Sequence, residues 1–343
     1  MDRQTFANFD LLSFYMAILV VSIHLSIASF YDFDFSSSAD RVCFFCFNVV
    51  KDTISLVCVP FFFLKSGILF FRNFKLGDYF PKIKRRFFSL FIPYCIWNML
   101  CYLFDLFVCN FPLTSKYIVG RSVSFGFEDF LRAVLLYENN LVNWFLLTLI
   151  FFALFSPVFL ALAKNKYIGV AFVLLAFYGF ENICESSAWI PPYVSSAFGF
   201  YLLGALIARH GMGFFSLRFD AVWGRAAWVM LVLLYALLFA YKSELNTLVY
   251  YPIIFACLVC IWVGVSSLNV ESRWFYGASF IIYESQVIVA SSVMKLIYIL
   301  FPHTSYFAVA NFYATLAIST VLSVALYAAI KKYPLLRALL NGR

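Results

Sequence analysis

Long apolar segments separated by polar connections run the whole length of the sequence. The first of them, Phe9 to Phe30, is long enough to cross a bilayer, since a transmembrane helix needs about 20 mostly apolar residues. The pattern predicts an all-α integral membrane protein, a bundle of about ten transmembrane helices, at approximately residues 9–30, 43–71, 87–109, 142–163, 168–185, 192–209, 225–241, 247–266, 275–300 and 307–330.

Three polar positions share one face of the first predicted helix. Asp10 and Ser13 both return to within about 40° of the His24 face, because a helix turns ~100° per residue. An ionisable side chain inside a membrane is costly and usually functional. The helix therefore presents a narrow polar stripe that leads to His24 deep in the membrane. Packing of this histidine against a neighbouring helix is the alternative.

The composition predicts one membrane-embedded domain over residues 1–343. Hydrophobic residues make up 64% and charged residues 12%, whereas a soluble domain is about a quarter charged. Most of the 25 Lys and Arg residues fall in connections on the same side as the N-terminus, so the net charge of +8 does not indicate a nucleic-acid partner. Such connections are usually cytoplasmic. We expect both termini in the cytoplasm and a multi-pass protein of the cell inner (plasma) membrane, in contact with lipid.

Two cysteine pairs have a spacing found in metal sites, Cys43 with Cys46 and Cys257 with Cys260. They have no His or Cys companions close by in the sequence, so we interpret them as small apolar residues within helices and expect no metal.

One predicted connection, residues 111–141, is long enough to have a function and is expected outside the cell. It could cover an acceptor site as a lid. It could equally be a solvated connector with a short interfacial helix at 127–137. The sequence leaves both open.

Several short motifs follow one another along nearly the full length of the chain. The sequence resembles the acyltransferase-3 family of integral membrane O-acyltransferases in this ordered series, which comprises Phe9–Ser13 with Val20–His24, Val59–Leu69, Lys82–Arg86 with Ile92–Trp97, Asn143–Leu146, Phe200–Gly204, Ser279–Gln286 and Pro334–Arg337. Each motif is weak alone, and the order of all of them is fairly specific.

The resemblance implies transfer of an acyl group, with acetyl as the expected case, from cytoplasmic acyl-CoA to a hydroxyl of a surface or exported polysaccharide or lipid-linked glycan. The histidine of span one, His24, would be the general base, because imidazole titrates near neutral pH. A carboxylate would orient its ring. Asp10 lies roughly 21 Å away by helical rise, and Glu181, Glu185 and Glu284 are the other candidates.

The cationic residues Lys82, Arg85 and Arg86 are candidates to bind the phosphates of the CoA nucleotide. They could equally anchor the topology and contact anionic lipid. The family's arginine in span one is Ser13 here, and Lys65 lies at a similar predicted depth. We therefore expect Lys65 to supply the missing charge beside Ser13 and to pair with Asp10.

Four further residues are candidates for the acceptor site, namely Trp144 and Asn143 at an entrance and Tyr283 and Gln286 in a central cavity. Gln286 replaces a histidine of the family pattern. We expect a cytoplasm-facing cavity between spans one, two and three that ends near His24.

Two other functions remain open. A polytopic transporter or flippase-like carrier would use His24, Lys65 and Glu284 as a polar pathway. A catalytically weakened relative would account for the missing arginine and histidine. We find no internal repeat, which a carrier with inverted halves would show.

Overall fold

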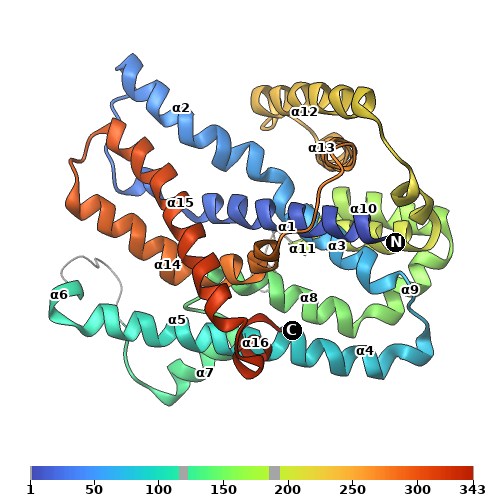
Figure 1. The fold of residues 1–343 in the computed structure, drawn as a ribbon, viewed down its shortest axis with the longest axis horizontal. Coiled ribbons are helices and arrows are strands. Elements are labelled where there is room, and N and C mark those ends of the chain that lie inside the picture. Colours follow the sequence, from blue (N-terminus) through green and yellow to red (C-terminus); the bar gives the residue numbers. More distant parts are fainter. Residues whose placement is uncertain (1, 116–122, 185–193, 343) are drawn as a thin grey trace.

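The computed structural model describes residues 2–115, 123–184 and 194–342, and every regular element in these segments is helical. Figure 1 shows the helices, of which the longer ones are α1 (Arg3–His24), α2 (Ser38–Asp52), α3 (Cys58–Phe71), α5 (Ile92–Asn110), α10 (Lys166–Cys184), α11 (Val194–Leu206), α12 (Ala221–Tyr241), α13 (Thr247–Ser266), α14 (Ser279–Leu300) and α15 (Ser305–Ile330). The shorter helices are α4 (Tyr79–Arg86), α6 (Pro112–Ser115), α7 (Phe127–Leu136), α8 (Trp144–Leu154), α9 (Ser156–Lys164) and α16 (Pro334–Asn341).

Eight helices in the described segments are long and apolar enough to cross a membrane, or nine if the bent pair of α7 and α8 counts as one span. The chain is therefore a multi-pass membrane protein, and the predicted total of about ten is not confirmed. The predicted span at 142–163 is broken between α8 and α9 at Phe155. Pro157 has no backbone N–H to donate at this point, which explains the break.

The first helix runs through the middle of the molecule (Figure 1). Asp2 begins it by accepting hydrogen bonds from the Thr5 backbone nitrogen and hydroxyl at 2.8 and 2.6 Å. Its apolar residues are buried on several faces, including Leu12, Phe14 and Val21. A helix that is apolar all round packs in the interior, and α1 contacts α3, α14 and α15.

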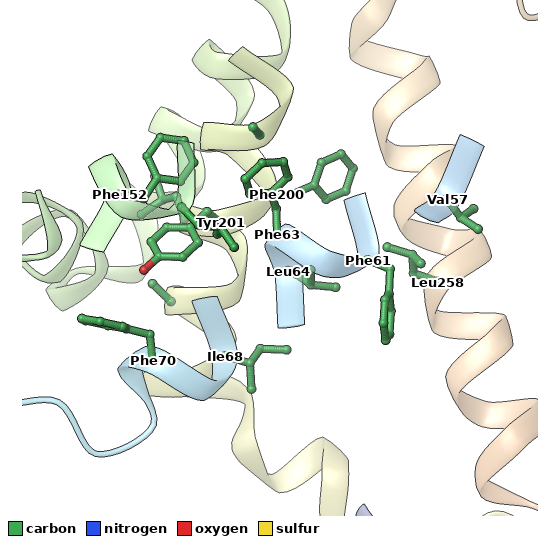
Figure 2. Packing of buried hydrophobic residues seen from close by; sticks show 14 of the residues in the cluster. Val57, Phe61, Phe63, Leu64, Ile68, Phe70, Phe152, Phe200, Tyr201 and Leu258 are labelled. Atoms are coloured by element: carbon green, nitrogen blue, oxygen red, sulfur yellow. The ribbon is translucent and has the colours of Figure 1, made fainter. Parts of the chain in front are cut away.

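Helices α3 and α11 cross with their backbones in contact at Gly67 and Gly204. A Cβ at Gly67 would lie 2.3 Å from the Tyr201 carbonyl oxygen, and one at Gly204 would lie 2.3 Å from the Leu64 carbonyl oxygen. Small residues allow such close approach between membrane helices. Figure 2 shows apolar side chains around this crossing, with Tyr201 of α11 beside Phe152 of α8 at 5.0 Å between ring centroids.

The bundle has two chemically different ends. The Arg72 guanidinium lies 5.2 Å from the Phe6 ring centroid, so the end of α3 and the start of α1 lie at the same end of the bundle. We call it the basic end. His24 ends α1 at the other end, about 27 Å from Phe6 by helical rise. We call that the His24 end.

The C-terminal helix packs at the basic end. Trp97 Nε1 of α5 donates to the Leu340 carbonyl oxygen at 2.9 Å. Gly342 then takes φ +64°, and a Cβ there would lie 2.1 Å from the Ser89 carbonyl oxygen. Only glycine fits such a close approach with positive φ, so this segment is held against the start of α5.

Helix α7 confirms the short helix predicted within the long connection. It is fixed to α5 by two side chains. Tyr94 Oη donates to the Leu135 carbonyl oxygen at 2.8 Å, and Asn98 Nδ2 donates to the Val134 carbonyl oxygen at 3.0 Å.

Candidate active site

The first helix ends at His24, so this residue is a helix terminus and is not in mid-helix as the apolar run predicted. Leu25 is extended, with φ −77° and ψ 106°. Just before it, Ser22 Oγ lies 2.8 Å from Ser55 Oγ, and Ser55 Oγ donates to the Val50 carbonyl oxygen at 2.8 Å. These serine contacts tie the end of α1 to the segment that precedes α3.

The His24 side chain is exposed to a large cavity rather than packed against its neighbours. The cavity has a volume of about 700 Å³, and it is lined by Ile23, His24, Ser55, Leu56, Val59, Pro60, Trp144, Ser196, Lys242, Leu245, Thr247, Tyr250, Tyr251 and Ile254. Aliphatic, aromatic and polar side chains therefore line the cavity that the imidazole borders, and its volume admits a ligand of considerable size.

The other two histidines have structural partners. His210 Nε2 lies 2.9 Å from the Ala163 carbonyl oxygen. His303 Nε2 lies 2.8 Å from the Tyr298 carbonyl oxygen, and its ring stacks on Tyr298 at 3.9 Å. Among the described residues, no hydrogen bond is formed by the His24 ring. His24 is thus the histidine whose nitrogen atoms remain available to a substrate.

A second cavity, of about 440 Å³, gathers the predicted cationic residues at the basic end. It is lined by Leu69, Phe70, Arg72, Asn73, Lys82, Arg85, Arg86, Ser89 and Gly342. Lys82 Nζ donates to the Phe70 carbonyl oxygen at 2.7 Å, and the Arg86 guanidinium lies 5.6 Å from the Phe70 ring centroid. Four cationic side chains, three from α4 and Arg72 directly after α3, thus line one hollow, a geometry that suits a polyphosphate.

Lys65 contacts Ser13, as the sequence predicts. Its Nζ donates to Ser13 Oγ and lies 5.8 Å from the Phe9 ring centroid. The predicted pair with Asp10 is not formed, because no hydrogen bond or ion pair of Asp10 occurs among the described residues. Lys65 also lines an apolar cavity of about 210 Å³ between α1, α3 and α13.

A sealed polar cluster holds three of the predicted site residues. Glu284 is fully buried, and one end of the Asn143 amide lies 3.2 Å from both of its carboxylate oxygens. The other end of that amide lies 2.7 Å from Asn98 Oδ1. Tyr283 Oη donates to the Val142 carbonyl oxygen. A buried carboxylate needs such partners, so we interpret the cluster as a positioning element.

Gln286 lies next to this cluster. Its Nε2 donates to the Tyr283 carbonyl oxygen at 2.7 Å, while its Oε1 is buried without a partner among the described residues.

The structure separates groups that we expected together. The cavity at His24 is lined by the first two spans, α8, α11 and α13, and not by the third span as predicted. The basic cavity and the His24 cavity share no lining residue. Glu284 lines neither of them. Glu185 and the side chain of Glu181 lie outside the described residues.

The sequence did not point to Lys242, Tyr250, Tyr251 or Ser196 as residues of the His24 cavity. The adjacent tyrosines at the start of α13 were a usable signal, because paired aromatic side chains at the end of an apolar run suit a polar ligand as well as a membrane interface. Their proximity to His24 depends on the packing of helices that are distant in the sequence.

Comparison with protein families matches residues 6–328 to the acyltransferase domain that defines the acyltransferase-3 family. The match includes His24, Lys65 and the cationic residues of α4. The chain belongs to this family and is a membrane acyltransferase by family. Searches of curated proteins and of solved structures give no match.

Proposed function

We propose that this protein transfers an acyl group, with acetyl as the expected case, from acyl-CoA to a hydroxyl group of a surface or exported polysaccharide. His24 is the general base. The observation that carries the proposal is the exposure of His24 to a cavity of about 700 Å³ in a chain of the acyltransferase-3 family. The expected location is the inner membrane, with the basic end facing the cytoplasm.

The proposed reaction is a direct transfer. The acceptor oxygen attacks the thioester carbonyl carbon, and the hydroxyl proton passes to a neutral ring nitrogen of His24. The tetrahedral intermediate then collapses by breaking the carbon–sulfur bond. The departing CoA thiolate takes the proton from the imidazolium. The products are an ester on the glycan and free CoA thiol, with the imidazole neutral again.

The basic cavity is the proposed site of the CoA nucleotide. Arg72, Lys82, Arg85 and Arg86 supply positive charge for its phosphates. Helix α3 borders both cavities, with Pro60 at the His24 cavity and Leu69 at the basic cavity. Nine helical steps separate these residues, which is about 14 Å. An extended pantetheine arm can cross this distance once the helices around Lys65 part to admit it.

The transporter alternative has less support. His24 lines the largest of the three cavities, Lys65 lines the apolar cavity, and Glu284 is sealed among asparagines. His24, Lys65 and Glu284 therefore do not line a common cavity among those described. A carrier needs a continuous polar pathway, and these residues do not form one.

The test is the acylation of surface glycans in cells that contain wild-type protein, His24→Ala or His24→Asn. Mass spectrometry should show loss of the ester in both variants, because neither side chain accepts the hydroxyl proton as a base. His210→Asn is the matched control and should retain acylation, since His210 has a structural partner. Acylation that persists in His24→Ala at wild-type protein level would contradict the proposal.

A further inference from the structure

We propose that the acceptor carries a negative charge near the hydroxyl that is acylated, from a carboxylate or a phosphate, and that Lys242 and Arg41 bind this charge. The inference rests on the proposed function and adds the chemical class of the acceptor. It follows from the distribution of cations at the His24 end.

Lys242 lines two adjoining cavities. One is the His24 cavity, and the other is a hollow of about 300 Å³ that is also lined by Arg41, Asn48 and Asp52. The Lys242 ammonium donates to the Asp52 carbonyl oxygen at 2.7 Å. Because an ammonium has three donors, this bond fixes its position and leaves donors for a ligand.

Further positive charge lies close by. Arg41 is exposed and lines the second hollow. Asp52 is the acidic residue among those that line the two hollows. The linings thus hold two cationic side chains, Lys242 and Arg41, and one carboxylate. Outer connections of membrane proteins are generally poor in Lys and Arg, so a topology signal does not explain the group.

The rest of the lining suits a sugar. Trp144, Tyr250 and Tyr251 offer aromatic faces with polar tips, and Ser196 adds a hydroxyl. A glycan with an acidic group can place its apolar ring faces on these aromatics while its charge lies between Lys242 and Arg41. A neutral glycan would make no charge-assisted contact with either cation.

The first experiment identifies the acceptor in cells. The glycan that loses its ester in the His24→Ala strain is isolated, and its composition is determined by mass spectrometry. A carboxylate or phosphate group within the acylated unit is expected. If the sugars are neutral, the lipid-linked glycan is compared with the same glycan released from its carrier. A requirement for the phosphate-containing lipid carrier assigns the charge to that carrier, and equal activity of the lipid-linked and the released neutral glycan overturns the inference.

The second experiment measures acceptor kinetics of the full chain in liposomes. Lys242→Met and Arg41→Met should each raise the acceptor KM roughly tenfold, because each loses a charge-assisted contact. Neither should change the KM for acyl-CoA. Higher ionic strength should raise the wild-type acceptor KM and have a smaller effect in the double variant.

The control is Arg132→Met. Arg132 is also exposed, lies on α7 and forms an ion pair with Glu128 at 2.5 Å. It does not line the His24 cavity. Unchanged acceptor KM in Lys242→Met and Arg41→Met overturns the inference while acyl transfer stands. Failure of the proposed function is a different result, in which no glycan loses its ester in the His24→Ala strain.

Discussion

The His24 cavity and the basic cavity differ in size, chemistry and construction. The His24 cavity has about 700 Å³ and mostly aromatic and aliphatic walls, with residues from five parts of the chain. The basic cavity has about 440 Å³ and carries four cationic side chains, three from the short helix α4 and one, Arg72, directly after α3. One end of the bundle is therefore shaped for a bulky ligand, and the other is charged for a compact anion.

Under the proposed function, the two cavities would serve two unlike substrates. A CoA nucleotide would be much the same for any acyl donor, so a short local segment would suffice to bind its phosphates. An acceptor glycan would vary in shape, so its site would need walls from several helices. Helix α3 lines both cavities, and it crosses α11 in close contact at Gly67 and Gly204, between the residues that line the one and those that line the other.

The largest effect is expected from removing charge at the basic cavity. In the double variant Arg85→Gln, Arg86→Gln, the KM for acyl-CoA should rise about 100-fold, because two charge-assisted contacts of roughly 1.5–3 kcal/mol are weakened. The acceptor KM should not change. Initial rates of CoA release at varied donor and acceptor concentrations measure both.

Lys84→Gln is the matched control for this variant, since Lys84 is exposed on the same helix and does not line the cavity. An equal rise in the KM for acyl-CoA in Lys84→Gln would indicate that the segment acts through general attraction to anionic lipid. The basic cavity would then not be a specific anion site that differs from the His24 cavity.

The next effect concerns the crossing that holds the two ends apart. Gly204→Ala and Gly67→Ala should each lower the free energy of unfolding by about 1–3 kcal/mol, because each Cβ meets a carbonyl oxygen at 2.3 Å and the helices must separate. Thermal unfolding in detergent measures this. Gly213→Ala serves as the control, since nothing lies within 4 Å of its Cβ position. Equal unfolding temperatures for all three variants would argue against a tight crossing.

The smallest effect is expected between the two ends, at Lys65. Lys65→Met should lower kcat for acyl transfer roughly tenfold by removing the charge beside Ser13. Ser13→Arg in the same chain should restore part of the rate, because the guanidinium returns a cation to the same space. A double variant no better than Lys65→Met would show that the position of the charge on α3 is essential.

The sequence predicted the membrane class and most of the helices because uncharged apolar runs of this length are typical of membrane-spanning helices and rare in soluble domains. The break of the fourth run was not anticipated, although Pro157 was visible as a signal. The run of apolar residues after His24 also concealed the end of α1. Hydropathy continues through Leu25 and Ile27 whether or not the backbone remains helical.

The site was predictable where its residues are close in sequence and not where they are distant. Lys82, Arg85 and Arg86 line one cavity as expected, because one short helix carries them. Lys65 reaches Ser13 because adjacent spans run antiparallel with matching depth. The partner of Glu284 is Asn143. Asn143 lies directly before α8 and Glu284 lies in α14, so the contact joins segments that are distant in the sequence and no spacing indicates it.

Helix α3 lines the His24 cavity, the basic cavity and the apolar cavity. This shared position has a consequence for how the protein could diversify. A substitution that shifts this helix along its axis would alter the basic cavity and the His24 cavity in the same step, so that an improvement at one would bring a loss at the other. New ligand preferences should therefore arise more readily in parts of the chain that border the His24 cavity without lining the basic cavity, such as the start of α13, while α3 stays constrained because it lines both.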